Sequence, residues 1–329
     1  MIFLSLVVVL AILHWLGRAG FIQYDGWFRL LVNRLHKIPG IASVPVLALV
    51  LALLIPLVLL LVIFVLLYHN LGRTSLFFLY VPVLLYSLGR GNLVEDVKAY
   101  IELVNKGDNV AASLWVENLR GNKKPVGKDL DCDIEINDWR SLHTQALKTI
   151  AYRGFERTFA VIFWFVIVGP FGALLYRLSV LYRELAEEGS ADAQVAAKWL
   201  WLLELPAVRL MGVTWAFVGN FETSPLRRNL LDIESASSSV LNECLRGALG
   251  AQTEHSNAAM AAMNPEQQAE YQEELEEETQ DIIEDLTGDL VTTHNEPGYS
   301  FALIKSSLPL YNRSLLFWVC AIAFATLFV

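Results

Sequence analysis

The sequence predicts an all-α, polytopic integral membrane protein with four or five spanning helices, amphipathic or interfacial helices and polar helical lobes. Its 329 residues are 55% hydrophobic and only 18% charged, whereas soluble domains carry about 25% charged residues. The mean hydropathy is positive, +0.44. This composition excludes a disordered chain, and the net charge of −9 argues against a nucleic-acid partner, which usually requires a basic face.

Five apolar runs are candidates for spanning helices. The charge-free run 38–72 is long enough to cross a bilayer by itself, with kinks at Pro45 and Pro56. The run 158–176 is a second, and the shorter runs are 75–88, 314–329 and 2–16. The last of these lacks the basic flank and cleavage site of a signal peptide, so we expect it to be retained as a helix.

Basic residues predict how these helices are oriented. Loop 17–37 contains four Lys or Arg residues against Asp25 alone. We therefore expect this loop inside the cell, the short loop 69–74 outside, and the polar stretch 90–157 inside. The lipid bilayer is the one partner that this pattern requires.

The segment 199–219 is apolar but contains Glu204, Pro206 and Arg209. Because charges are costly inside a bilayer, we expect an interfacial or re-entrant helix pair packed on the bundle. If the segment crosses instead, the acidic region after it is cytoplasmic, so the side of 220–313 stays open.

Five segments follow from this pattern of apolar and polar residues. They are the N-terminal membrane helices with their basic loop (1–89), a polar helical lobe (90–157), a membrane helix with an amphipathic or re-entrant helix (158–219), an acidic helical region (220–313) with an insertion at 250–297, and a C-terminal membrane helix (314–329).

Helical spacing of apolar residues continues into the polar segments. In 90–118 it predicts an amphipathic helix hairpin that breaks at Gly107-Asp108, and 137–157 is a helix leading into the next apolar run. Residues 264–290 combine an apolar stripe with an acidic face. That helix either docks on its own protein or binds a protein partner.

Motifs for metal or nucleotide binding are incomplete. The acidic run 129–135 resembles the start of a calcium loop, but Ile134 replaces the required Gly and Arg140 the bidentate Glu. Residues 121–128 resemble a P-loop with misplaced glycines, and the serines of 235–239 lack a nucleophile context. The three cysteines and six histidines show no ligand spacing, so we expect no metal and no cofactor.

The strongest local pattern surrounds the run 158–176. Arg153 and Glu156 precede it, a Gly-Pro-Phe-Gly break lies in its middle at 169–172, and Tyr176-Arg177 ends it. A structural interpretation is a helix kink with basic and aromatic interface anchors. The alternative is a small-molecule pocket with charged walls, which Arg209 would complete.

Two stretches resemble a known family. FWFVIVGPFGALLYRLSVLY (163–182) and LPAVRLMGVTWAFVG (205–219) are similar to the AmpE regulatory membrane proteins. These are bacterial inner-membrane proteins associated with inducible β-lactamase regulation and a cytosolic muropeptide amidase. The resemblance implies a multi-pass inner-membrane protein of signal transduction and antibiotic resistance.

The AmpE proteins are in turn similar to the CbiB/CobD cobinamide-phosphate synthases, which form an amide with ATP. The Gly-Pro-x-Gly-Ala-x-x-Tyr-Arg core of the synthase motif is kept here, as is a Pro-Ala-Arg-Leu-x-Gly element into which Val208 is inserted. The family-motif residues that we expect to act structurally are Gly169, Pro170, Gly172, Pro206 and Gly212.

The polar part of the synthase motif is largely lost. Tyr152 and Arg153 replace an acid and an Asn, only Glu156 falls at an Asp, and Val180 and Arg183 replace a later Asn and Asp. Magnesium-dependent amide synthesis needs carboxylates and polar groups for orientation.

We therefore expect no catalytic residue and a regulatory or sensory function linked to β-lactamase induction and cell-wall recycling. The residues of the candidate ligand pocket are Arg153, Glu156, Tyr176, Arg177 and Arg209. A membrane-bound, amide-forming enzyme with an unknown substrate remains the alternative.

Overall fold

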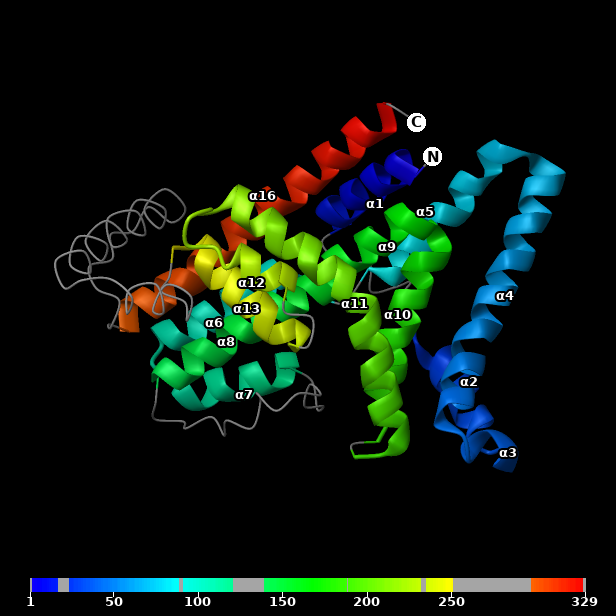
Figure 1. Ribbon diagram of the computed structural model, residues 1–329, viewed down its shortest axis with the longest axis horizontal. Coiled ribbons are helices and arrows are strands. Elements are labelled where there is room, and N and C mark those ends of the chain that lie inside the picture. The colour runs from blue at the N-terminus through cyan, green and yellow to red at the C-terminus, as the bar shows by residue number, and fades with distance from the viewer. Residues whose placement is uncertain are drawn as a thin grey trace. The chain divides into compact units, whose positions relative to one another are not determined.

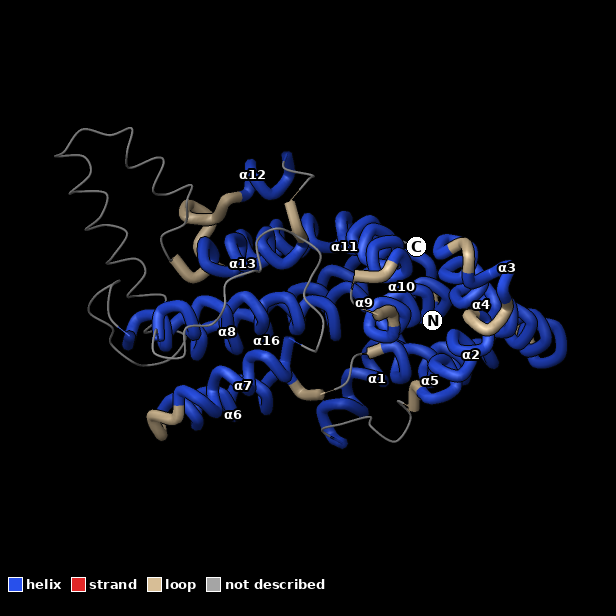
Figure 2. Tube along the Cα trace, turned by 90° about the horizontal axis from the view of Figure 1, so that it is seen from below, coloured by secondary structure: helices blue, strands red, loops and turns tan. Residues whose placement is uncertain are grey.

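A computed structural model describes residues 2–16, 24–88, 91–120, 139–187, 189–231, 235–250 and 297–327. Within these ranges the chain forms helices, turns and loops and contains no strand (Figure 2). The all-α prediction is thereby confirmed. The calcium-loop-like and P-loop-like segments, the insertion and the acidic helix 264–290 lie outside the described residues.

The helices are labelled in chain order in Figure 1. Their bounds are α1 Ile2–Leu16, α2 Gly26–Leu35, α3 Pro39–Ala42, α4 Pro45–Leu71, η1 Arg73–Leu76, α5 Phe77–Ser87, α6 Leu93–Asn105, α7 Asn109–Arg120, α8 Trp139–Gly154, the π-helical turn η3 Phe155–Phe159, α9 Ala160–Val168, α10 Pro170–Leu185, α11 Ala191–Val218, α12 Leu226–Leu231, α13 Ser237–Ala248 and α16 Pro297–Leu327.

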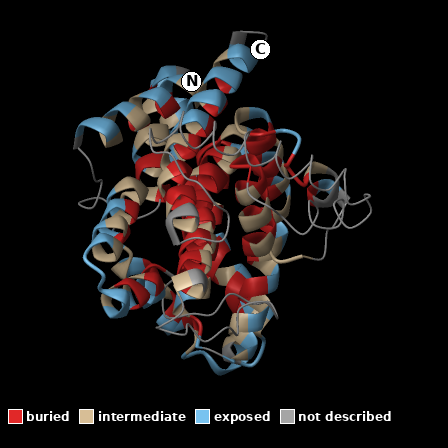
Figure 3. Cartoon of the chain, turned by 90° about the vertical axis from the view of Figure 1, so that its left-hand side faces the viewer, coloured by how far each residue is buried: buried red, intermediate tan, exposed pale blue. Residues whose placement is uncertain are grey.

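The helices form two compact units. Unit 1 comprises Met1–Asn92, Glu156–Ala207 and Ala321–Val329, and unit 2 comprises Leu93–Phe155 and Val208–Cys320. Some helices are buried over most of their surface and others are largely exposed (Figure 3).

Three of the described helices are long and apolar enough to cross a membrane. They are α4 (Pro45–Leu71), α11 (Ala191–Val218) and most of α16 (Ser300–Thr326), with shorter apolar helices at Ile2–Trp15 and Thr74–Ser87. This confirms a polytopic membrane protein. In α4, Pro45 lies in the first turn, where no backbone N–H is needed, and Pro56 lies inside the helix.

The segment 199–219 differs from the predicted helix pair, because α11 runs without a break through Pro206. Its two charged side chains each have a hydrogen-bond partner within the protein. Glu204 is buried and accepts a hydrogen bond from the Tyr176 hydroxyl (3.3 Å), while Arg209 donates to the Asn229 amide oxygen (3.2 Å). Since buried charges are tolerated when they have partners, the helix does not have to break at them.

The run 158–176 also differs from a single kinked span. The chain turns at Gly169, whose φ of 71° is in the left-handed region, and so separates α9 from α10. Helix α9 follows the π-helical turn without an intervening loop and ends at this glycine, so the run 158–176 is not one helix. The C-terminal helix is longer than the predicted 314–329, since α16 begins at Pro297.

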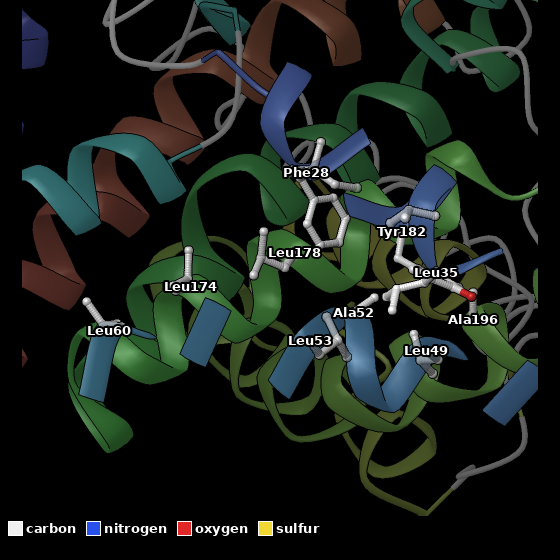
Figure 4. Packing of buried hydrophobic residues seen from close by; sticks show 12 residues of the cluster. Phe28, Leu35, Leu49, Ala52, Leu53, Leu60, Leu174, Leu178, Tyr182 and Ala196 are labelled. Atoms are coloured by element: carbon white, nitrogen blue, oxygen red, sulfur yellow. The ribbon is translucent and has the colours of Figure 1, made fainter. Parts of the chain in front are cut away.

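The core of unit 1 joins four helices. Leu174, Leu178 and Tyr182 of α10 pack with side chains of α2, α4 and α11. Figure 4 shows Phe28 and Leu35 of α2 pointing into the same cluster. Helix α10 is therefore covered on most sides by other helices.

The predicted hairpin in unit 2 is confirmed. Helices α6 and α7 pack together, and both contact α8. The chain reverses at Gly107, with φ 72°, and the Asp108 carboxylate accepts a hydrogen bond from the Ala111 N–H (2.9 Å), as a helix cap does.

A buried histidine joins α8 to this hairpin. The Tyr100 hydroxyl lies 3.0 Å from Nδ1 of His143, and the rings of Trp139 and Phe301 lie against the imidazole. Burial lowers the pKa of His143, because the charged form loses its solvation.

This burial predicts an acid-sensitive unit 2. The unfolded His143, with a pKa near 6.5, takes up a proton more readily than the folded one, so stability is complete above about pH 6.5 and falls below it. This histidine changes the free energy of unfolding by at most about 1.4 kcal/mol per pH unit. In His143→Phe this contribution to the pH dependence should disappear. Thermal unfolding in detergent from pH 7.5 to 5 measures it, and equal slopes in the two proteins would contradict the assignment.

Candidate functional site

Helix α10 carries most of the residues that the motif singled out. It is also the most enclosed helix of unit 1, with eleven buried residues out of sixteen: Pro170, Gly172, Ala173, Leu174, Tyr176, Arg177, Leu178, Ser179, Val180, Leu181 and Tyr182. Its polar side chains bind different neighbouring segments of the chain.

The start of α10 packs closely on α9. Gly169 provides the positive φ of the turn, and Pro170 occupies the first helical position, which suits its fixed φ. A Cβ at Gly172 would overlap the carbonyl oxygen of Trp164, one backbone against another. The Gly-Pro-x-Gly motif thus forms the tight tip of a helical hairpin.

The other end of this hairpin is closed by an ion pair. The Arg183 guanidinium donates to the Glu156 carboxylate at 2.6 Å, and the two side chains are only 18% and 3% exposed. Glu156 lies in the π-helical turn before α9, a type of turn that is frequent at functional sites. The Arg183 guanidinium therefore pairs with the buried carboxylate of this turn.

Arg177 binds at the start of α2. Its Nη2 lies 3.3 Å from Oδ2 of Asp25, and the other carboxylate oxygen accepts a hydrogen bond from the Tyr86 hydroxyl of α5 (3.2 Å). The Arg177 side chain is 9% exposed, so this contact is mostly removed from solvent.

The third face of α10 binds α11. Tyr176 donates to Glu204, and the Trp199 indole N–H donates to the Ser179 hydroxyl (3.0 Å). Nearer the loop between the two helices, the Tyr182 hydroxyl donates to Asp192 (3.4 Å). These contacts align α10 and α11 as antiparallel neighbours.

The five predicted pocket residues divide between the two units. Glu156, Tyr176 and Arg177 belong to unit 1, with the partners given above. Arg153 and Arg209 belong to unit 2, where the Arg153 Nε–H donates to the Leu119 carbonyl (2.8 Å). Whether all five serve one ligand stays a prediction.

Gly212 permits close packing around Arg209. A Cβ there would overlap the amide of Asn229 and press on the Cys244 sulfur. Asn229 forms two hydrogen bonds with Arg209. Its amide oxygen accepts one from the guanidinium, and its amide nitrogen donates one to the Arg209 carbonyl (3.3 Å). The Arg-x-x-Gly spacing therefore holds the arginine against α12.

A small crevice lies beside this contact in unit 2. Its volume of about 10 Å³ is at the lower limit for one water molecule, and its lining residues are Pro225, Asn229, Ser235, Ser239, Val240, Glu243 and Cys244. Burial raises the pKa of the Cys244 thiol to about 12, with Glu243 adding to the effect. A thiol with that pKa is not a nucleophile at neutral pH.

Sequence reasoning overlooked several of these partners. Asp25 was counted only as the single acid of a basic loop, and Glu204 only as a cost to a membrane helix. A lone acid in an apolar or basic context signals a buried partner. That signal could have selected both residues, whereas nothing local in the sequence singles out Tyr86 or Asn229.

The comparisons with known proteins agree with this architecture. A family model described as "Regulatory signalling modulator protein AmpE" matches residues 1–263. The cobalamin biosynthesis protein CobD of Stutzerimonas stutzeri is 31% identical over 144 residues, which are 40% of this chain and 46% of that protein. The chain thus spans about half the length of this relative, and no solved structure matches.

The helices and their candidate spans define an all-α, polytopic membrane protein. The family match, which covers most of the chain, then gives the particular family: the chain belongs to the AmpE family. It is a regulatory protein of a bacterial membrane.

The contribution of the Arg183–Glu156 pair can be tested by measuring the stability of variants. Arg183→Gln should lower the free energy of unfolding by roughly 3 kcal/mol, because a carboxylate that is 3% exposed loses its cation. The double variant Glu156→Gln/Arg183→Gln should recover most of this loss, since no charge stays buried. Thermal unfolding in detergent measures both, and strictly additive losses would count against the pair.

The close approach at Gly172 can be tested with alanine. Gly172→Ala should destabilise the protein by about 1–3 kcal/mol, because backbone atoms of α9 must move away. Gly40→Ala is the matched control, since a Cβ there would meet no atom within 4 Å. Equal unfolding midpoints of the two variants would rule out the tight tip.

Proposed function

We propose that this chain is a non-catalytic regulatory protein of the bacterial inner membrane, acting in β-lactamase induction and muropeptide recycling. Its membership of the AmpE family supports a regulatory membrane protein, and its apolar helices support a membrane location. The inner membrane and the link to β-lactamase rest on the resemblance to that family.

One observation carries the non-catalytic part of the proposal: Arg183 binds Glu156 at 2.6 Å. A carboxylate that holds magnesium or orients an amine must offer its lone pairs to that group. Here the lone pairs face a guanidinium, at the position where the synthases carry an acid. The polar groups of α10 then serve to hold its neighbours in place.

A mechanism follows from those contacts. Helix α10 binds Asp25, the π-helical turn and α11 through buried polar pairs. A ligand or partner that competes for one of these pairs would release one segment and leave the others. It could shift the helix packing only by the difference between its affinities for the two arrangements.

A second candidate is a membrane enzyme that forms an amide, like the cobinamide-phosphate synthases. The similarity to the Stutzerimonas CobD protein supports it, although it covers 40% of this chain. The retained tyrosine and arginine of the motif, Tyr176 and Arg177, would bind the substrate, with Arg209 holding a phosphate or carboxylate.

A complementation experiment distinguishes the two functions. In a bacterium with an inducible β-lactamase, deletion of this chain should change the β-lactamase activity induced by a β-lactam, and the wild-type chain should restore it. The double variant Glu156→Gln/Arg183→Gln should also restore it, because it keeps the packing and removes only the charges.

Lys98→Gln, at an exposed position of α6, is the matched control. Membrane levels of all variants are compared by immunoblot. Loss of induction in the double variant at a normal membrane level would favour the enzyme, as would growth rescue of a strain that lacks its cobinamide-phosphate synthase. An unchanged induction after deletion would reject the regulatory function.

A further inference from the structure

Helix α2 precedes α4, the most apolar of the candidate spanning helices, and the short helix α3 lies between them. Only residues 36–44 separate the end of α2 from α4, and the two helices pack on each other. Phe28, Val32 and Leu35 are buried in the unit 1 core. One side of α2 is therefore fixed to the protein.

Both ends of α2 are held by polar contacts as well. At its start, Asp25 binds Arg177 and Tyr86. At its end, Nε2 of His36 lies 3.4 Å from the Asp192 carboxylate of α11. The contacts of Asp25 and the buried Phe28, Val32 and Leu35 thus fix which side of α2 faces the core.

That outward face is cationic. Arg29 and Arg34 are exposed on either side of Leu30, and Lys37 is exposed just after the helix. Within the part of the chain that the structure describes, these three cations form no ion pair. Asp25, the one acidic residue in 24–44, is already bound to Arg177.

Apolar side chains are exposed on the same segment. Leu30 is 62% exposed and Trp27 39%, and Ile38 and Val44 are about half exposed, at 49% and 46%. Exposed apolar side chains recur at the start of α4, where Val46 is 55% exposed. Basic residues that flank apolar and aromatic side chains are typical of a helix lying in the membrane interface.

We propose that α2 and residues 36–44 bind the headgroups of anionic phospholipids. Arg29, Arg34 and Lys37 would contact the phosphates, while Trp27, Leu30 and Ile38 enter the boundary with the acyl chains. Exposed apolar side chains recur at the start of a candidate spanning helix, which favours a lipid over an acidic protein as the occupant. This inference does not depend on the proposed regulatory function.

The size of the effect follows from the charge. Each Lys or Arg near an anionic membrane surface strengthens binding by about fivefold at moderate ionic strength. The attraction is screened over roughly 8–10 Å by physiological salt. Anionic lipids should therefore be enriched around α2 in a salt-dependent manner.

The experiment uses the full-length protein in bilayers of phosphatidylcholine that contain about one third phosphatidylglycerol, an anionic lipid. In one sample the phosphatidylglycerol carries brominated acyl chains, and in a second sample the phosphatidylcholine does. The fluorescence of Trp27 is obtained as the difference between the wild-type protein and Trp27→Phe. Brominated phosphatidylglycerol should quench Trp27 several-fold more, per mole fraction, than brominated phosphatidylcholine. In the triple variant Arg29→Gln/Arg34→Gln/Lys37→Gln, the two brominated lipids should quench Trp27 equally.

Two controls keep the result specific. Arg29→Lys keeps the charge and should keep the preference, and Lys98→Gln removes an exposed charge from unit 2 and should not alter it. Equal quenching of the wild-type protein by the two lipids would overturn the proposal. So would a preference that survives in the triple variant, or one lost equally in Lys98→Gln.

Discussion

The buried ion pair between Arg183 and Glu156 closes one end of the α9–α10 hairpin, and α2, α4 and α11 pack on the α10 arm of that hairpin. It joins the end of α10 to the turn before α9, so the two arms of the hairpin have to run side by side. Once α10 is placed in this way, its other polar side chains face α2 and α11. The charges are buried, and each needs its partner, because an unpaired charge at such a site costs several kcal/mol.

Gly169 and Gly172 form the other end of the hairpin. Gly169 turns the chain where a left-handed φ is needed, and Gly172 lets the first turn of α10 lie against the α9 backbone. The two glycines of the Gly-Pro-Phe-Gly break are thus explained by the geometry of the hairpin.

Local patterns predicted the elements well. The helical spacing in 90–118 and the break at Gly107 gave α6 and α7, and the charge-free run gave α4. Segment 17–37 is an exception, since it was predicted as a basic loop and its residues 26–35 form α2. In the other cases the information lies within one or two turns of helix, which is the range of a periodicity argument.

Contacts between distant segments were not predictable in the same way. The run 158–176 has the hydropathy of a single span, whereas the turn at Gly169 and the pairing of Glu156 with Arg183 show that it folds back. Similarly, Glu204 and Arg209 indicated a break in 199–219 until their partners Tyr176 and Asn229 were placed. One chain without an alignment carries no signal that links residues so far apart.

The hairpin at Gly169 is tested most directly by labelling from one side of the membrane. Thr158→Cys and Glu184→Cys, each in a chain whose native cysteines are replaced, are treated with an impermeant maleimide in oriented vesicles. A hairpin predicts that both are labelled from the same side. A continuous helix would place them roughly 39 Å apart at 1.5 Å per residue, and labelling from opposite sides would contradict the account.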